Sequence, residues 1–253
     1  MATRTVSYGK CFLCGETFAK NAINRHLQKC VPAHETGRGE PVRLFRLQVE
    51  GYYSPQYWMH LEIPATATLA DLDDFLRDVW LECCGHLSAF TIGNTRYKLD
   101  AEMVDAMWGE LFPSRYTTRD MDVSLEEALS VGQTFTYEYD FGTTTTLRLK
   151  VVGEREGPWP KGGVLVLARN YAPVFTCTEC GEPARWVYTW SGEYETYCDK
   201  HAREHEDWEN GFLPIVNSPR VGECAYTGPT RRSLKFEETM PEKAGESAGS
   251  SGA

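Results

Sequence analysis

The sequence lacks long hydrophobic runs. No stretch approaches the roughly 18 apolar residues that a membrane-spanning helix needs. The first residues show neither the apolar core of a secretory signal nor the amphipathic pattern of a transit segment. These absences predict a cytoplasmic protein with no membrane partner. In a reducing cytosol, closely spaced cysteines bind metals more often than they form disulfides.

Only the N-terminal region carries a net positive charge. The 253 residues carry 26 Lys and Arg against 36 Asp and Glu, a net charge of −10, whereas residues 1–40 carry six basic against three acidic residues. An acidic surface repels the phosphate backbone of nucleic acids. Nucleic-acid binding by the whole chain is therefore disfavoured, and only the first 40 residues have the right sign for it.

The motifs of a protein kinase are also missing, although Asp140-Phe141-Gly142 has the letters of a kinase magnesium site. No GxGxxG loop, strand lysine or HRD-type loop accompanies the triplet, which excludes that interpretation. A tight corner explains it better, with Asp140 binding nearby backbone N–H groups and Gly142 supplying a positive φ.

Cysteine, in contrast, is abundant, and six of the nine cysteines fall into two clusters that each include a histidine. The clusters are Cys11-x2-Cys14-x11-His26-x3-Cys30 and Cys177-x2-Cys180-x17-Cys198-x2-His201. Two ligands separated by two residues can turn back onto one ion, and a longer spacer lets a helix or hairpin bring the second pair round. Four such ligands match a closed tetrahedral site. We therefore expect two structural Zn²⁺ ions per chain.

The first cluster predicts a small ββα-type zinc finger over residues 1–34, with its helix over residues 20–29. Phe18 and Ile23 lie between the ligand pairs, at the apolar positions that such a module packs beneath its metal. The segment resembles the C2H2 and C2HC zinc-finger class. It departs from the C2H2 pattern in its terminal cysteine and in a spacer one residue short of 12.

Two roles remain open for this finger. Its helix begins with Lys20, Asn21, Asn24 and Arg25, where a finger that reads the DNA major groove would present them. The alternative, which we favour, is a solvated polar face on a structural module. A single finger covers about 3 base pairs, which is too little for specific DNA binding unaided.

The second cluster predicts a zinc-ribbon-like module over residues 173–228. Aromatic and polar residues alternate between its ligand pairs, as expected of a hairpin beneath a zinc knuckle. His205 and Cys224 are spare candidate ligands, and His205 is better explained as a polar residue on an acidic helix. A redox role for Cys177 and Cys180 is less favoured, because the second ligand pair completes a closed metal site.

Residues 41–170 predict a central α+β domain with a mixed β-sheet and packed helices, flanked by the two zinc modules. Alternating or β-branched residues predict strands over 43–50, 51–65, 87–92 and 134–152, the first two consistent with a hairpin and the last broken by the corner at Asp140-Phe141-Gly142. Thr68 and Asp71 predict a capping box that opens a helix ending near Trp80, and short helices are expected over 101–111 and 124–129, the latter capped by Ser124. Residues 236–253 are low in complexity and predict a disordered tail.

Three phrases of this domain together resemble the plasmid pRiA4b ORF-3-like family, which includes TnpR-like passenger proteins of an insertion element. They are WMHLEIPATATLADLDDFLRDVW, GHLSAF and FTYEYDFG, and they occur in the family's order over about half of the chain. The resemblance implies an α+β fold, a mobile-element association and no settled biochemical role. The chain departs from the family at 143–146, where four threonines replace the usual Asp, Trp and His.

An enzymatic alternative remains, because Cys83, Cys84, His86 and Asp140 could form a thiol and imidazole site. We favour a structural explanation, with both cysteines as small buried groups after a helix and His86 as a satisfied strand histidine.

Three hypotheses of function follow. The leading one is a non-enzymatic binding or adaptor protein with a protein partner. The second is a nucleic-acid-associated factor that uses the basic finger, and the third is a hydrolase-like enzyme with its site near His86 and Asp140.

Overall fold

The computed structural model describes residues 6–35, 40–99, 116–159, 163–191 and 194–241. Ten strands form one large sheet. They are β1 (Tyr8–Cys11), β2 (Thr17–Ala19), β3 (Pro41–Gly51), β4 (Trp58–Pro64), β5 (Ser88–Ile92), β6 (Thr95–Lys98), β7 (Thr117–Asp120), β8 (Thr134–Tyr139), β9 (Thr145–Pro158) and β10 (Leu165–Asn170). Their order across the sheet is β2-β1-β10-β4-β3-β9-β8-β5-β6-β7. The parallel β6–β7 pair makes this otherwise antiparallel sheet mixed, which confirms the predicted α+β class.

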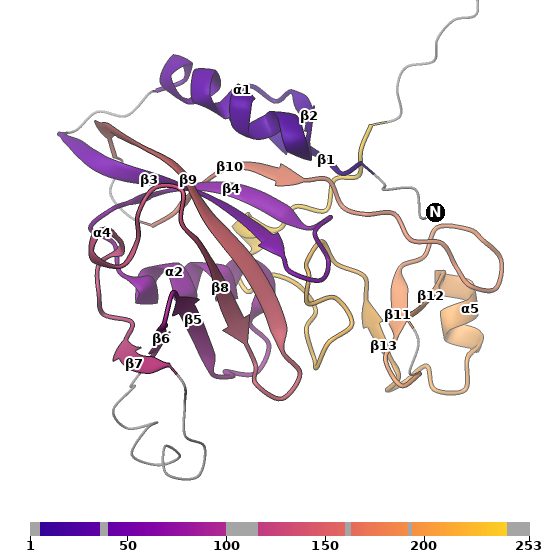
Figure 1. Cartoon of the computed structure of the whole chain (residues 1–253). Helices are drawn as coiled ribbons and strands as arrows, with labels where there is room; N and C mark the ends of the chain where they lie inside the picture. The colour runs from indigo at the N-terminus through magenta and orange to yellow at the C-terminus, as the bar shows by residue number, and fades with distance from the viewer. Residues whose placement is uncertain (1–5, 36–39, 100–115, 160–162, 192–193, 242–253) are drawn as a thin grey trace, which may run out of the picture.

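The two faces of the sheet are covered by different helices, α1 (Lys20–Ala33) and α2 (Leu69–Leu76), as Figure 1 shows. Alternation along a strand sends successive side chains to opposite faces. In β4, Met59 and Leu61 therefore join the main core with α2, whereas Trp58 joins a second core with α1. The predicted hairpin of β3 and β4 is confirmed, with Leu47 opposite Leu61.

Helix α2 begins at the predicted capping box. The backbone N–H of Asp71 donates to Thr68 Oγ1 at 3.1 Å, and the N–H of Thr68 donates to Asp71 Oδ2 at 2.8 Å. Its apolar stripe continues into a π-helical turn, η1 (Arg77–Leu81), in which Trp80 is fully buried. The box and the stripe together fix where the helix starts and which face packs on the sheet.

Two local predictions were wrong in their details. Ser124 is the N-cap of α4 (Leu125–Ala128), but its hydroxyl makes no capping hydrogen bond. At the corner after β8, Asp140 itself takes the positive φ of 63°, and Gly142 does not. The short carboxylate tolerates this conformation by accepting the N–H groups of Gly142 and Thr143, at 3.0 and 3.2 Å. The helix expected over 101–111 lies outside the described residues.

The N-terminal finger continues the central sheet. Strand β1 pairs with β10, and Gly9 lies opposite Asn170. A Cβ at Gly9 would meet the Arg169 carbonyl oxygen at 2.3 Å and the Trp58 ring at 2.6 Å, so only glycine permits this close approach. The finger therefore packs as part of the central domain.

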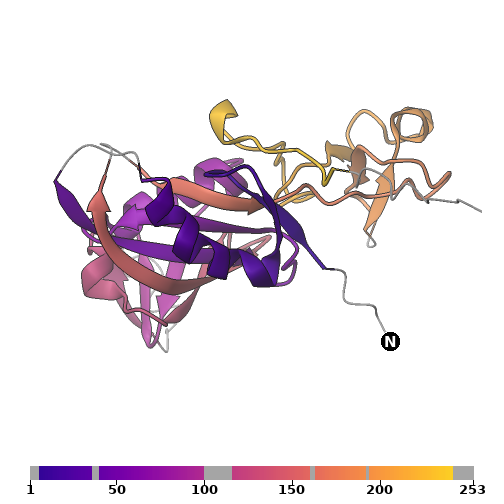
Figure 2. The ribbon, with the colours of Figure 1, turned by 90° about the horizontal axis from the view of Figure 1, so that it is seen from above.

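The second predicted module has its own small sheet, in the order β12 (Glu195–Tyr197), β11 (Trp186–Tyr188) and β13 (Phe212–Pro214). Helix α5 (Asp199–Glu204) follows β12, and Figure 2 shows the module at one end of the molecule, beyond the large sheet. The chain then returns to the central domain, where Val216 and Tyr226 join the main core.

The last described residues include the 3₁₀ turn η2 (Arg232–Leu234) and part of the predicted disordered tail. Phe236 is buried, and Glu238 pairs with Lys10 at 2.9 Å. The tail prediction was therefore wrong for these residues, because one buried aromatic ring and one ion pair attach them to the body. Among the described residues, no helix has the length and apolar character needed to cross a membrane.

Candidate metal centres

All nine cysteines of the chain fall into three groups, and each group contains three cysteines and one histidine. Within each group the four ligand atoms lie within 4.8 Å of one another. The groups are Cys11, Cys14, His26 and Cys30 (site 1); Cys177, Cys180, Cys198 and His201 (site 2); and Cys83, Cys84, His86 and Cys224 (site 3). Sites 1 and 2 bring together the residues that the sequence predicted, whereas site 3 was not predicted.

Site 1 joins the β1–β2 turn to helix α1. Cys11 ends β1, and His26 and Cys30 are one helical turn apart on α1, so all four ligands face the same point. The Cys11 and Cys30 sulfurs are 3.8 Å apart, and Cys14 Sγ is 3.4 Å from His26 Nε2. The Phe18 ring stacks on His26, as expected of an apolar residue beneath the metal.

Burial shapes the electrostatics of site 1. It lowers the pKa of His26, which keeps the imidazole neutral as metal ligation requires. Burial, together with a contact to the Cys11 sulfur, raises the pKa of Cys30 to about 12. Thiolates this close together are stable only beside a cation, because each one repels the others.

Site 2 is formed by a turn and the start of α5. Cys177 Sγ is 3.4 Å from His201 Nδ1, and the Cys180 and Cys198 sulfurs are 3.9 Å apart. Burial raises the pKa of Cys177, but backbone N–H groups at Cys198 and Cys180 outweigh it and lower the value to about 6. Such N–H···S contacts stabilise a thiolate before any metal is bound.

His205 does not belong to site 2. It follows α5 as its C-cap, rather than lying on a longer acidic helix. Its Nδ1 accepts the backbone N–H of Asp207 at 3.1 Å, and its ring packs against Tyr188 and Phe212. The aromatic packing accounts for this histidine without a metal.

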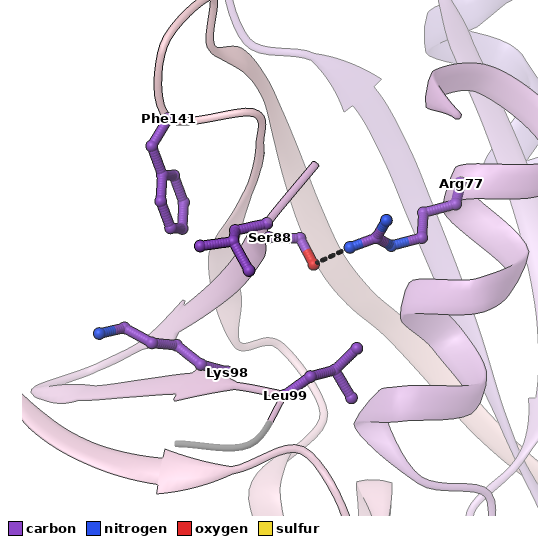
Figure 3. A pocket seen from close by; sticks show the side chains of 6 residues that line it. Arg77, Ser88, Lys98, Leu99 and Phe141 are labelled. Atoms are coloured by element: carbon purple, nitrogen blue, oxygen red, sulfur yellow. Dashed lines mark hydrogen bonds between the residues drawn. The ribbon is translucent and has the colours of Figure 1, made fainter. Parts of the chain in front are cut away.

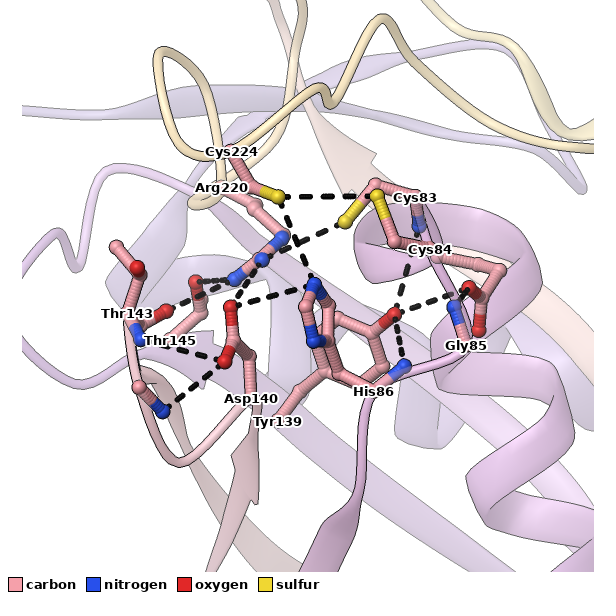
Figure 4. Close-up of polar contacts among 12 residues, drawn as sticks. Cys83, Cys84, Gly85, His86, Tyr139, Asp140, Thr143, Thr145, Arg220 and Cys224 are labelled. Carbon is pink, nitrogen blue, oxygen red and sulfur yellow. Dashed lines mark hydrogen bonds and ion pairs between the residues drawn. The ribbon is translucent and has the colours of Figure 1, made fainter.

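Site 3 overturns our structural explanation of the central cysteines. Cys84 is exposed, and His86 lies before β5 with a side chain that is 31% exposed. The Cys84 and Cys224 sulfurs are 3.7 Å apart, and Cys224 Sγ is 3.5 Å from His86 Nε2 (Figure 4). The spare ligand candidate Cys224 therefore belongs to site 3 and not to site 2.

Asp140 lies beside site 3, with Oδ2 at 3.6 Å from His86 Nε2. The same oxygen accepts a 2.8 Å hydrogen bond from the fully buried Arg220, which also donates to the Thr143 carbonyl and to Thr145 Oγ1 (Figure 4). Burial raises the pKa of Asp140, but hydrogen bonds from the Arg220 guanidinium and from the Thr143 and Gly142 N–H groups together outweigh it and hold the pKa below its usual value. The Asp140 carboxylate therefore forms an ion pair with Arg220 and stabilises the corner after β8.

A shallow hollow lies nearby, between the end of α2 and the corner after β8 (Figure 3). Its lining residues are Arg77, Leu87, Ser88, Lys98, Leu99 and Phe141. Arg77 donates to Ser88 Oγ at 2.9 Å, and both side chains bind the fully buried Asp73. These polar groups satisfy one another, so the hollow presents no unpaired nucleophile from this network.

The four candidate nucleic-acid residues of α1 differ in their exposure to solvent. Lys20 is half-buried, with its ammonium against the Glu50 carboxylate and the Pro55 carbonyl. Asn24 is also half-buried, whereas Asn21 and Arg25 are exposed. The helix therefore presents two of the four side chains outward, and one of those is basic.

The family model described as plasmid pRiA4b ORF-3-like protein matches residues 43–208. No curated protein matches. Among solved structures, the crystal structure of a protein of unknown function from Methanosarcina mazei Go1 matches 67% of this chain and 87% of that chain, at 14% sequence identity and a TM-score of 0.39.

Proposed function

This chain belongs to the plasmid pRiA4b ORF-3-like family, and we propose that it is a zinc-binding, non-enzymatic adaptor protein of the mobile-element-associated type. The family's description names a plasmid, which supports the mobile-element association. The adaptor role rests on sites 1 and 2, which each offer four protein ligands to one ion. A catalytic zinc site has three protein ligands and keeps its fourth position for water or substrate.

The zinc-ribbon-like module supports a protein partner. Between β11 and β12, Trp190 is 60% exposed and Tyr194 is 54% exposed. Large aromatic side chains held on a rigid scaffold are the residue types that dominate protein–protein binding energy. Site 2 would supply that rigidity, because it ties the end of the same hairpin to α5.

Capture from a lysate of the source cell tests this proposal. The tagged, zinc-loaded chain, treated with nuclease, should retain one protein at a stoichiometric ratio. Replacing both Trp190 and Tyr194 by alanine should weaken retention at least tenfold, since hot-spot residues each contribute about 2 kcal/mol. Tyr53→Ala is the matched control, because Tyr53 is 84% exposed on the β3–β4 turn. Equal retention by all three proteins, or no stoichiometric partner, would contradict the proposal.

The nucleic-acid alternative would depend on Arg25 and Asn21, because Lys20 is engaged with Glu50. It requires a gel shift at low salt that weakens as salt rises and that is lost in Arg25→Ala. We expect no such shift. A clear one would favour this alternative over a protein partner.

The hydrolase alternative would need Asp140 to orient His86 as a general base. The 2.8 Å ion pair with Arg220 instead holds that carboxylate in the corner after β8. Because Asp140 is held by Arg220 and is not positioned to orient His86, the non-enzymatic proposal is favoured.

A further inference from the structure

Site 3 joins two parts of the chain that are far apart in sequence. Cys83, Cys84 and His86 lie in the loop between η1 and β5, and Cys224 lies in the segment that returns from the zinc-ribbon-like module. In Figure 4 the Cys224 sulfur points toward Cys84 and His86. No chain proximity explains this convergence, because 138 residues separate His86 from Cys224.

The distances in site 3 match those of a tetrahedral zinc site. With Zn–S of about 2.3 Å and Zn–N of about 2.0 Å, a tetrahedron places two sulfurs about 3.8 Å apart and a sulfur and a nitrogen about 3.5 Å apart. The Cys84–Cys224 and Cys224–His86 distances are 3.7 and 3.5 Å. Sites 1 and 2 have S···S distances of 3.8 and 3.9 Å and S···N distances of 3.4 to 3.5 Å.

The loop that carries three of the ligands is held in place by its own hydrogen bonds. Glu82 Oε1 accepts the Gly85 N–H at 2.6 Å and the Tyr139 hydroxyl at 3.0 Å. The Tyr139 oxygen in turn accepts the backbone N–H groups of Cys83 and His86, each at 3.4 Å. Gly85 has a φ of 72°, which lets the loop reverse between its ligands. The three donors are therefore positioned before a metal arrives.

The fourth ligand, Cys224, is positioned by a separate set of contacts. Arg220 is fully buried, pairs with Asp140 and donates to Cys83 Sγ at 3.5 Å, which fixes the returning segment against the loop. Cys224 has a φ of 52°, and in the described part of the chain only Asp140 shares a positive φ among non-glycine residues. A cysteine rarely adopts this conformation, and such strain is retained where surrounding contacts enforce it.

We propose that Cys83, Cys84, His86 and Cys224 form a third Zn²⁺ site, which fastens the C-terminal segment to the central domain. Three thiolates and one imidazole select a soft or borderline divalent ion such as Zn²⁺ over Mg²⁺ or Ca²⁺. Cys84 and Cys224 are exposed, so this ion is the most accessible of the three. His86 Nε2 is free to ligate, because Asp140 Oδ2 at 3.6 Å is too distant for a hydrogen bond.

Zinc content per chain tests the proposal. The purified protein should carry three zinc equivalents by native mass spectrometry, and Cys224→Ser should carry two. Ala225→Ser, at the neighbouring exposed position, should keep three. Two equivalents in the unchanged protein, with Cys83, Cys84 and Cys224 as free thiols, would overturn site 3 while leaving sites 1 and 2 intact. A mass showing a Cys84–Cys224 disulfide in the freshly isolated protein would overturn it equally.

A second measurement needs no variant that could misfold. An alkylating reagent should leave Cys84 and Cys224 unmodified in the zinc-loaded protein although both are exposed, because a metal-bound thiolate is shielded. A chelator should make them the first cysteines to react. Rapid modification of both residues in the zinc-loaded protein would refute a third ion.

Discussion

At the scale of single residues, His60 shows how burial controls a titratable group. It is 1% exposed on β4, and its ring nitrogens have no hydrogen-bond partner among the described residues. Burial, with further repulsion from Arg46 and Lys20, lowers its pKa to about 3. The folded protein therefore keeps His60 neutral where the unfolded chain, with a pKa near 6.5, already takes up a proton.

This difference predicts a loss of stability in mild acid. Between about pH 6.5 and pH 3 the unfolded state binds one more proton than the folded state, so stability falls with pH by up to about 1.4 kcal/mol per unit. His60→Leu removes this contribution. The free energy of unfolding of His60→Leu, relative to the unchanged protein, should therefore rise by about 2 kcal/mol from pH 7 to pH 5. Chemical denaturation in excess zinc measures it, and a pH-independent difference would contradict a buried neutral histidine.

Breaking the buried Asp140–Arg220 ion pair should also lower the stability of the folded protein. Asp140→Asn preserves the corner, because asparagine tolerates a positive φ, but it leaves the fully buried Arg220 without its counter-charge. Breaking one side of a buried pair costs about 3 kcal/mol or more. Thermal or chemical unfolding should show this loss.

Glu154→Gln is the matched control for that pair. Glu154 binds Arg43 at 2.7 Å, and both side chains are more than 40% exposed. An exposed pair contributes at most about 1 kcal/mol. Equal losses in Asp140→Asn and Glu154→Gln would mean that Arg220 is not anchored as described.

At the scale of elements, two helix starts offer a direct comparison. Thr68 caps α2 through its side chain, whereas Ser124 stands at the start of α4 without a side-chain capping bond. Thr68→Ala should lower the free energy of unfolding by about 1 kcal/mol, and Ser124→Ala should leave it nearly unchanged. Denaturant titration of both variants measures the difference, and equal effects would show that Thr68 does not act as a cap.

Local patterns predicted most elements of the central domain. The alternation of 43–64 and 134–152 and the capping box at Thr68 each depend on neighbours within a few residues, so the sequence alone carries them. The positive φ of the corner after β8 was predicted for Gly142 but is found at Asp140. The local sequence does not show this, because the corner depends on hydrogen bonds that Asp140 accepts from Gly142, Thr143 and the distant Arg220 together.

The same distinction explains which metal sites could be predicted. Sites 1 and 2 have ligand pairs at close spacing, and each closes within 25 residues. Site 3 needs Cys224, which lies 138 residues after His86, so no local spacing indicates it. One available signal was missed, since removing the six predicted cysteines leaves three more, and His86 lies beside two of them.

At the scale of the whole molecule, the finger and the central sheet share strands and core. Site 1 holds β1 and α1 together, β1 pairs with β10, and Leu27 of α1 belongs to the same buried core as Trp58 of β4. Loss of the site 1 metal should therefore destabilise the neighbouring strands of the central sheet as well as the finger. A finger that unfolds independently would leave those strands unchanged.

Hydrogen exchange tests this connection. Cys14→Ser should speed amide exchange in β10 at least tenfold, because it releases the strand that pairs with one side of β10. Cys180→Ser removes a site 2 ligand and should leave β10 protection unchanged. If β10 exchanged equally slowly in both variants, the finger would be an independent module.

Zinc X-ray absorption on the purified chain tests most directly whether these ions are fully enclosed by protein. Ligation by three cysteines and one histidine predicts an average of three sulfurs at ~2.3 Å and one nitrogen at ~2.0 Å for every zinc, with no oxygen from water. A first coordination shell containing water oxygen, or fewer than three sulfurs per ion, would contradict closed structural sites and indicate an ion available for catalysis.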